Sequence, residues 1–475
     1  MKERLKTFLL LSLVCISILF TKRLWIRLPG DMSLFLNRNN EVLSVSYLLS
    51  DMIVPNKYLI NFNEENHTLV YDDSKYGTWI NSRKNLSEIL SSKNIKIEDI
   101  SNEDYLKYHS EKSIVFYFPE KVNTYMLARA WDVKEPNSIA DTMPNINSIY
   151  IYLGSGNPFF VFSENSKHIA IYDSEINISN LRDNINAIDE KKNYTRYYSM
   201  KQDFGIGNDI YVPAEIKNVL PRVYVTNEIA TMGEEEKGKL VEKIFNKQLD
   251  YIEEVVEDNG SSIYIYNQRV IKFNINGTLE YFHPLGKVVK EGNLYASLSS
   301  AADFISKNTD AQKGMYLAKV EEINSDDSLG YRLTFRYRIM GIPVILGNRE
   351  VSDYIQMEVF NDHIRSYKEY ARKEVSLIPN TVIDGKEILP SYKVIDENYE
   401  LLENRYLTLN NLTEDNAGDD IIQKVISSIK DVTLGYYDPC FKDKEEKLVG
   451  VWIIRLEGKL IAFDAYNGSL VFESK

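Results

Sequence analysis

The stretch VIKFNINGTLEYF, residues 270–282, decides how the second half of the chain folds, together with a similar stretch near the end. That second stretch is LIAFDAYNGSLVF, residues 460–472, and it carries one extra residue before its Asn-Gly pair. Asn-Gly between apolar runs is the strongest short signal for a hairpin with a type I′ turn. Both stretches are therefore predicted β-hairpins, and a third hairpin, residues 354–370, is predicted to turn at Asn361-Asp362.

Each predicted hairpin region has an amphipathic helix near it in the chain. Leu298 to Lys307 and Asp420 to Lys430 both show apolar residues at helical spacing. A helix laid across one face of an antiparallel sheet buries the apolar surfaces of both elements. The sequence therefore predicts two tandem related domains of antiparallel sheet plus helix, a middle domain at 259–373 and a C-terminal domain at 374–475.

The preceding region, residues 30–258, is predicted to be α+β and to hold one or two subdomains. Strand-like alternations and short amphipathic helices interleave there without a regular βαβ winding. The predicted strands are 112–118, 148–153, 158–162 and 168–173, and the predicted helices include 85–92 and a stripe of Leu181, Ile185 and Ile188. A further helix is predicted from a capping box at Thr231 and Glu234 to Ile252, ahead of Asn259-Gly260.

The chain begins MKERLKTFLLLSLVCISILFTKRLWIRLPG, residues 1–30. Phe8 to Phe20 is apolar except for Ser12 and Ser17, and Leu5 to Ile26 would give about 33 Å of helix, enough to cross a bilayer. No small-x-small cleavage site precedes Gly30. The sequence therefore predicts an uncleaved transmembrane anchor at 7–26, a cytoplasmic tail at 1–6 and an extracytoplasmic remainder, with a buried hairpin helix of a soluble protein as the alternative.

Composition and motifs limit the chemistry. A net charge of -13 disfavours nucleic-acid binding, because an acidic protein repels phosphate. The two cysteines, Cys15 in the anchor and Cys440, are not expected to pair, which fits a Gram-positive-like cell surface. The five histidines are scattered singly, and neither a nucleophile elbow nor a phosphate loop occurs. We expect no catalytic site, no metal and no cofactor, and therefore no enzyme.

Several stretches together resemble the YycH family. They are VPNKYLINF (54–62), FNINGTLEYFHP (273–284), YRLTFRYRIMGIPVI (331–345) and the closing region from LGYY at 434 to 470, in addition to the anchor. The resemblance implies a single-pass extracytoplasmic regulator of the WalK (YycG) sensor histidine kinase, part of a two-component system for cell-wall homeostasis in Gram-positive bacteria. It also implies that the middle and C-terminal domains are alike and related to the partner protein YycI, and residues 463–470 are similar to the ending of PepSY-type domains.

The resemblance further implies that regulation runs through transmembrane contacts with the kinase and with a YycI-like protein. The predicted contact residues are Leu9, Ser12, Leu13, Ile16 and Ser17. Helices associate in lipid through packing and polar side chains, which favours the two serines. They lie about 140° apart around a helix, so they do not share one tight face, and both could instead bond to carbonyls of their own helix.

Two other functions remain open at the level of the sequence. A cell-envelope polymer could stack on exposed rings such as Trp131, Tyr194, Tyr197 and Tyr198. The PepSY-like ending would instead fit an inhibitor of an extracytoplasmic protease. A groove lined by aromatic rings would support the first, and loss of inhibition after deletion of residues 431–475 would support the second.

Overall fold

The computed structural model describes residues 49–474 apart from 72–75, 209, 214–219, 309–313, 348–352, 371, 379–386, 414–415, 417, 419 and 441–444. The predicted tail and anchor, residues 1–26, lie outside the described residues. Within the described ranges, no helix is both long enough and apolar enough to cross a membrane.

The first sheet has nine strands in the order β3-β7-β6-β5-β4-β1-β2-β8-β9, and every neighbouring pair is antiparallel. Its strands are β1 (Lys57–Asn61), β2 (His67–Val70), β3 (Lys96–Ile100), β4 (Ser113–Asn123), β5 (Asn145–Tyr152), β6 (Phe159–Glu164), β7 (Lys167–Tyr172), β8 (Tyr197–Ser199) and β9 (Tyr211–Pro213). The helices of this region are α3 (Thr78–Ser91), α4 (Asn102–Tyr108), α5 (Thr124–Ala130), α6 (Ile139–Thr142), α7 (Ser179–Lys191) and α8 (Met200–Phe204).

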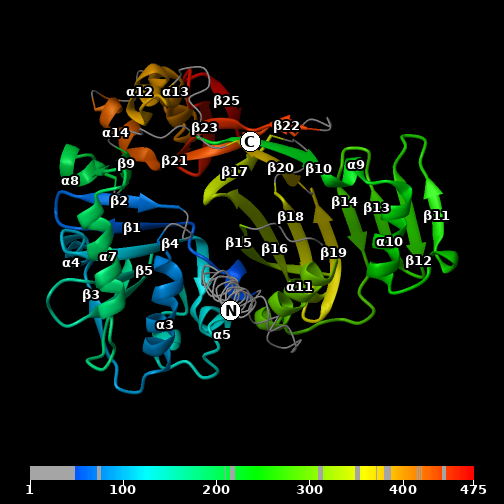
Figure 1. The fold of residues 1–475 in the computed structure, drawn as a ribbon, viewed down its shortest axis with the longest axis horizontal. Coiled ribbons are helices and arrows are strands. Elements are labelled where there is room, and N and C mark those ends of the chain that lie inside the picture. The colour runs from blue at the N-terminus through cyan, green and yellow to red at the C-terminus, as the bar shows by residue number, and fades with distance from the viewer. Residues whose placement is uncertain are drawn as a thin grey trace, which may run out of the picture. The chain divides into compact units, whose positions relative to one another are not determined.

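The two faces of this sheet follow the alternation of its strands. On β4 and β5, Phe116 and Ile149 belong to the main hydrophobic core, whereas Val115 and Tyr150 belong to a second, tyrosine-rich cluster on the opposite face. Helices α3 and α7 lie over the first face (Figure 1). The four strands predicted in this region are confirmed as β4, β5, β6 and β7.

The predicted helical stripe is also confirmed, because Leu181, Ile185 and Ile188 are the buried residues of α7. The helix predicted from Thr231 to Ile252 is shorter than expected. Its real extent is α10 (Glu234–Phe245), and its cap is a single bond from the Gly233 amide to the Glu236 carboxylate at 2.9 Å.

The predicted capping box was wrong because Thr231 ends α9 (Glu228–Thr231) and bonds back to Asn227. Asn246 closes α10 in the left-handed conformation. The chain beyond it forms a 3₁₀ turn, η3 (Leu249–Tyr251), and then a strand, β11 (Glu253–Val256).

Two further sheets organise the second half of the chain. A three-stranded sheet has the order β20 (Arg372–Ile378), β10 (Arg222–Asn227), β22 (Glu446–Lys447). A thirteen-stranded sheet has the order β11-β12-β13-β14-β19-β18-β16-β17-β21-β23-β24-β25, with β15 paired to β16. Its remaining strands are β12 (Ser262–Tyr266), β13 (Arg269–Phe273), β14 (Leu279–Phe282), β15 (Met315–Ser325), β16 (Ser328–Ile339), β17 (Ile342–Leu346), β18 (Ile355–Phe360), β19 (His363–Glu369), β21 (Ile429–Asp438), β23 (Val449–Leu456), β24 (Lys459–Asp464) and β25 (Leu470–Glu473).

The three predicted hairpins form as β13–β14, β18–β19 and β24–β25. The turn type predicted for the two Asn-Gly pairs was wrong. Only the glycines have positive φ, 80° at Gly277 and 73° at Gly468. The Gly277 amide donates to the Asn274 carbonyl at 2.9 Å and the Gly468 amide to the Asp464 carbonyl at 2.9 Å, so both loops are longer than a two-residue turn.

The second half of the chain repeats one order of elements, a helix followed by four strands. The segments that correspond between the two copies differ from the predicted ones. Helix α11 (Leu294–Asn308) precedes the strands β15, β16, β18 and β19, and α14 (Ile421–Ser428) precedes β21, β23, β24 and β25. Each set pairs in sequence as an antiparallel meander. The final hairpin therefore corresponds to β18–β19 rather than to β13–β14, and the likeness between 270–282 and 460–472 is a local hairpin similarity.

The middle and C-terminal meanders are not separate sheets. Strand β17 pairs antiparallel with β16 and parallel with β21. Hydrogen bonding between strands therefore continues from the predicted middle domain into the predicted C-terminal domain. The helices α12 (Ser391–Glu397) and α13 (Tyr399–Leu409) precede α14. The architecture is mixed α+β with several sheets, as predicted, and the predicted domain limits remain predictions.

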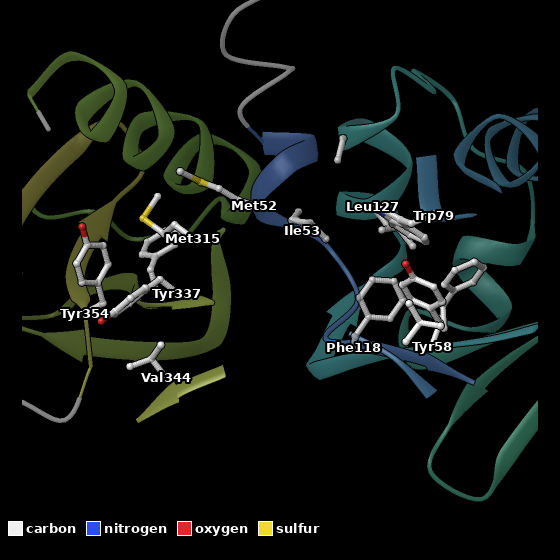
Figure 2. Packing of buried hydrophobic residues seen from close by; sticks show 14 of the residues in the cluster. Met52, Ile53, Tyr58, Trp79, Phe118, Leu127, Met315, Tyr337, Val344 and Tyr354 are labelled. Atoms are coloured by element: carbon white, nitrogen blue, oxygen red, sulfur yellow. The ribbon is translucent and has the colours of Figure 1, made fainter. Parts of the chain in front are cut away.

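One large hydrophobic core runs through the described chain. Figure 2 shows a group of its side chains from the nine-stranded sheet and its helices and a group from the thirteen-stranded sheet, with two consecutive residues drawn between them. The labelled residues are Tyr58, Trp79, Phe118 and Leu127 in the first group, Met315, Tyr337, Val344 and Tyr354 in the second, and Met52 and Ile53 between them. All of them are buried.

Candidate functional site

The described residues contain no group of three or more His, Cys, Asp or Glu side chains that could hold a metal ion. Three of the five histidines, His67, His109 and His168, are buried in the nine-stranded region. Burial lowers the pKa of all three, and that of His109 falls to about 4. These histidines are therefore neutral at physiological pH.

Their contacts are those of interior packing. The His67 ring bonds the Asn61 side chain at 2.8 Å, and the His168 ring bonds Ser163 at 2.8 Å and stacks on Tyr105. The other two histidines, His283 and His363, come together with ring centroids 4.4 Å apart. The sequence gives no spacing signal for this pair, because 80 residues separate its members.

The three arginines of β16 all have partners within the protein. Arg332 pairs with Glu358 at 2.9 Å and Arg336 with Asp353 at 2.8 Å. Arg338 donates to the Pro55 carbonyl at 2.8 Å and lies over the ring of Tyr316. This strand therefore does not present a row of cations to a phosphate backbone.

The strongest polar cluster lies where the meanders are joined, in β17, β20, β21 and β22, which we call the splice. Arg372 at the start of β20 makes two bonds of 2.8 Å to Asp438 at the end of β21. It also bonds Glu446 on β22, and its guanidinium lies 4.9 Å from the centre of the Tyr370 ring. The side chains of Arg372 and Asp438 are 0% exposed and that of Glu446 is 4% exposed.

This cluster is a structural lock. Burial alone would lower the pKa of Arg372, but the charge and hydrogen bonds of Asp438 raise it, so the guanidinium stays charged. Removing one partner of a buried ion pair leaves a charge without compensation and costs about 3–5 kcal/mol. Because the cluster joins a strand of the thirteen-stranded sheet to two strands of the three-stranded sheet, it fixes how these two sheets meet.

A pocket of about 590 Å³ opens beside the splice, and we call it the splice pocket. Its described lining is mainly aliphatic and aromatic: Arg336, Tyr337, Val344, Ile345, Leu346, Gly347, Asp353, Tyr354, Tyr437, Leu460, Val471, Phe472, Glu473 and Ser474. Histidine and cysteine are absent from this lining, so it offers an apolar surface rather than a nucleophile with a base.

Cys440 lies next to the splice and was given no catalytic role by the sequence. Its backbone has a φ of 57°, its amide donates to the Asp438 carboxylate at 2.8 Å, and its thiol donates to the Asp438 carbonyl at 3.3 Å. These contacts serve the turn after β21. They involve no histidine, so they do not suggest a thiol nucleophile.

The predicted site residues have two different outcomes. The transmembrane contacts Leu9, Ser12, Leu13, Ile16 and Ser17 lie outside the described residues, so they remain predictions. The rings proposed for polymer stacking do not form an open groove. Trp131 is buried against Trp79, Tyr197 is buried, Tyr194 stacks on Phe62, and Tyr198 packs against Phe204.

Sequence reasoning missed both the Arg372 cluster and the histidine pair. Arg372 lies 66 residues from Asp438 and 74 from Glu446, and the intervening chain gives no spacing signal for either partner. Only strand pairing brings these groups together.

Comparison with known proteins assigns the chain. Residues 3–193 match the family model described as the YycH protein, N-terminal domain. This N-terminal part of the chain, residues 3–193, belongs to the YycH family. The match implies, at a general level, a role in regulating the WalK (YycG) sensor histidine kinase.

One solved structure shares the fold of this chain at low sequence identity. The crystal structure of YycH from Bacillus subtilis matches with a TM-score of 0.52 and 13% identity, over 87% of this chain and 96% of that one. An uncharacterized protein from Eubacterium rectale matches at 0.36 and 13% identity, over 56% and 91%, and the Bacillus megaterium YpeB C-terminal domain at 0.24 and 12%, over 51% and 97%. None of the curated proteins matches the chain.

Proposed function

We propose that this YycH-family chain is a membrane-anchored extracytoplasmic regulator, which modulates a WalK-type sensor histidine kinase together with a YycI-like partner. The observation that carries the proposal is the family match, which begins at residue 3 and therefore includes the apolar N-terminal stretch. In this arrangement residues 1–6 are cytoplasmic, residues 7–26 cross the membrane, and the folded bulk lies outside the cell.

The regulator acts by binding and not by catalysis. A protein shifts a kinase between two states only by its difference in affinity for them, so the contact must favour one signalling state. Two features of the described chain support this mode: a large hydrophobic core with side chains from both large sheets, and an arginine cluster that joins two of the sheets.

The anchor contacts can be tested by photo-crosslinking. A crosslinking amino acid at position 12 or 17 should trap the kinase or the YycI-like protein in membranes. On a helix of about 100° per residue, Ile18 lies on the side opposite Leu9, so a crosslinker at position 18 is the matched control. Adducts with lipid alone from positions 12 and 17 would contradict the proposal.

Kinase output provides the functional test. Deleting the gene should change phosphorylation of the kinase's response regulator, and the intact chain should restore it. Replacing residues 7–26 by an unrelated transmembrane helix should anchor the chain without restoring the output. Unchanged output after deletion, or recovery of the mature protein in the medium without its first residues, would refute the proposed role.

A further inference from the structure

The paired histidines stand in a second pocket, remote in the chain from the splice pocket. It has a volume of about 850 Å³, within the range of small-molecule sites. The end of α10, the second half of α11, the end of β14 and the start of β19 supply its walls. The lining residues are Lys243, Ile244, Asn246, Tyr281, His283, Ser300, Asp303, Phe304, Lys307, Asn308, Asp362, His363 and Ile364.

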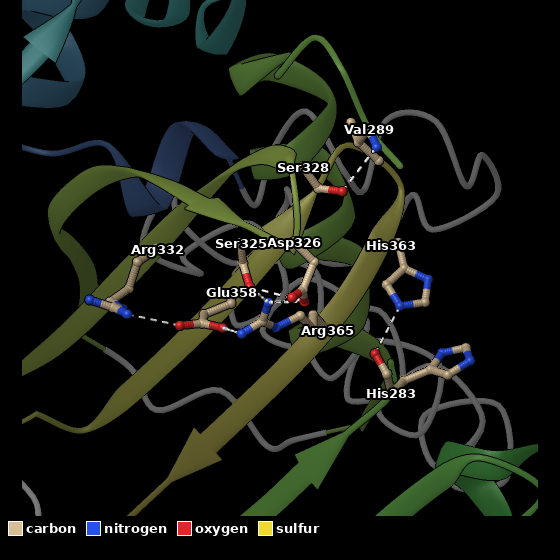
Figure 3. Close-up of polar contacts among 9 residues, drawn as sticks. All are labelled: His283, Val289, Ser325, Asp326, Ser328, Arg332, Glu358, His363 and Arg365. Carbon is tan, nitrogen blue, oxygen red and sulfur yellow. Dashed lines mark hydrogen bonds and ion pairs between the residues drawn. The ribbon is translucent and has the colours of Figure 1, made fainter. Parts of the chain in front are cut away.

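The floor of this pocket is aromatic. Phe304 on α11 lies 5.5 Å from Tyr281 and 5.1 Å from Tyr367, measured between ring centroids. Figure 3 shows the imidazoles of His283 and His363 beside one another. His283 follows the end of β14, and His363 begins the paired strand β19. The lining of this pocket thus combines aromatic rings with two imidazoles.

The hydrogen bonding of His363 restricts what it can recognise. Its Nε2 lies 3.0 Å from the His283 carbonyl, and a carbonyl only accepts, so this nitrogen carries the proton of the neutral ring. Nδ1 of neutral His363 is then an acceptor. It becomes a donor only when the ring gains a second proton. A ligand group that only accepts hydrogen bonds therefore binds to protonated His363.

The charges around the pair depend on pH through the histidines. Lys243 faces them from α10, Asp303 and Lys307 from α11, and Asp362 from the β18–β19 turn. The two aspartates balance the two lysines, and Asp303 is paired with Lys307 at 2.9 Å. Each proton gained by an imidazole therefore leaves the pocket with additional positive charge.

A group behind the pocket adds further positive charge. Arg269 on β13 bonds the Phe245 carbonyl at 3.1 Å and also hydrogen-bonds Tyr281. Burial, then the nearby His363 and Arg269, lower the pKa of His283. Arg365 on β19 is engaged by Glu358 at 3.1 Å. Arg269 therefore adds a positive charge behind the pocket, which favours a bound anion.

We propose that this pocket binds a small organic anion, with a carboxylate or phosphate group held between His283 and His363 and an apolar or ring-shaped part on Phe304 and Tyr281. Binding takes up a proton, so the affinity rises as the pH falls. The proposal does not rest on the kinase-regulating role, because it uses only the geometry of the pocket.

The test uses the full chain in detergent micelles with ¹³C-labelled histidine rings. Benzoate and phenyl phosphate are the anionic probes, and benzamide is the uncharged match for benzoate. We expect at least one anion to shift two of the five histidine signals, those lost in His283→Gln and His363→Gln. The signals of His67, His109 and His168 should stay in place, which also reports that each variant is folded.

The pH dependence and a charge variant sharpen the test. The anion should bind about tenfold more tightly at about pH 5.5 than at about pH 7.5, and benzamide should shift neither signal. Lys243→Gln should weaken binding several-fold, whereas Lys319→Gln, an exposed lysine paired with Glu321 on β15, should not. An unshifted histidine pair at both pH values, an equal effect of benzamide, or an affinity independent of pH would overturn the proposal.

Discussion

The nine-stranded and thirteen-stranded sheets are held together in different ways. The first is one uninterrupted run of antiparallel pairs, and its buried polar groups include three uncharged histidines. The second joins two meanders through the parallel pairing of β17 with β21, and a buried cluster of ion pairs around Arg372 locks that join. Helices pack against both sheets, so the presence of helices does not account for the difference.

The comparison indicates where each region is vulnerable. Neutral buried histidines weaken a sheet when acid charges them, since the unfolded chain then binds more protons. A buried ion cluster is strongly destabilised when one partner is removed. We therefore expect the two sheets to respond to opposite perturbations, and the following predictions test that difference from the largest effect to the smallest.

Removing the splice cluster should have the largest effect. Arg372→Ala leaves Asp438 and Glu446 buried without their partner, so the free energy of unfolding should fall by about 3–5 kcal/mol. Chemical denaturation followed by tryptophan fluorescence measures this loss. Hydrogen exchange should show that the opening starts at β20–β22 and not in the nine-stranded sheet.

The matched control for that variant is an arginine in a partly exposed pair. Arg332 is 38% exposed and bonds Glu358, so Arg332→Ala should cost only about 0–1 kcal/mol. Equal losses in the two variants would contradict the view that burial makes the cluster a lock.

Acid should act on the nine-stranded sheet. The pKa of His109 is about 4 in the folded chain against an ordinary value of 6.5, so the unfolded chain binds more protons between these values. Stability should therefore fall as the pH falls from 6.5 towards 4, by about 2–3 kcal/mol for this histidine. His67 and His168 act with the same sign.

Denaturation curves across this pH range, with hydrogen exchange to locate the opening, measure the effect. His109→Phe should flatten the slope of stability against pH. Tyr211→Phe, which removes the hydroxyl 3.4 Å from the His109 ring but keeps the imidazole, should retain it. A slope unchanged in His109→Phe would show that another group is responsible.

The two Asn-Gly hairpins provide a comparison within the thirteen-stranded sheet. Both Gly277 and Gly468 have positive φ, so alanine is strained at either site by about 1–2 kcal/mol. At Gly277 a new Cβ would also lie 2.2 Å from the buried Asn227 side chain, whereas at Gly468 it would meet the end of the flexible Glu397 side chain at 2.9 Å. Gly277→Ala should therefore lower the melting temperature more than Gly468→Ala, and the reverse order would contradict this account.

The smallest effect is expected where the two sheets touch. Lys57 at the start of β1 bonds Asp431 on β21 at 2.5 Å, and the two side chains are 18% and 25% exposed. Burial alone would raise the pKa of Asp431, but Lys57 and Thr433 hold that pKa below its ordinary value. Lys57→Met should cost about 1 kcal/mol in denaturation experiments, and a larger loss at low salt than at high salt would confirm its electrostatic origin.

The local elements were predictable because their signals lie within a few residues. The strands β4 to β7, helix α7 with its stripe of Leu181, Ile185 and Ile188, and the three hairpins all follow from alternation, helical spacing or turn residues. Element ends and turn types were less predictable. Thr231 had a capping signal, but its hydroxyl bonds back to Asn227 and Gly233 caps the next helix instead.

By itself, the sequence determined the mixed α+β class, the YycH-family assignment and the tandem arrangement of helix and sheet, because these depend on composition and on patterns repeated along the chain. Only the tertiary structure decided which strands pair, and with them the parallel join at β17, the Arg372 cluster and the meeting of His283 with His363. Pairing between strands far apart in the chain depends on burying whole faces at once, and no short stretch of sequence records that energy.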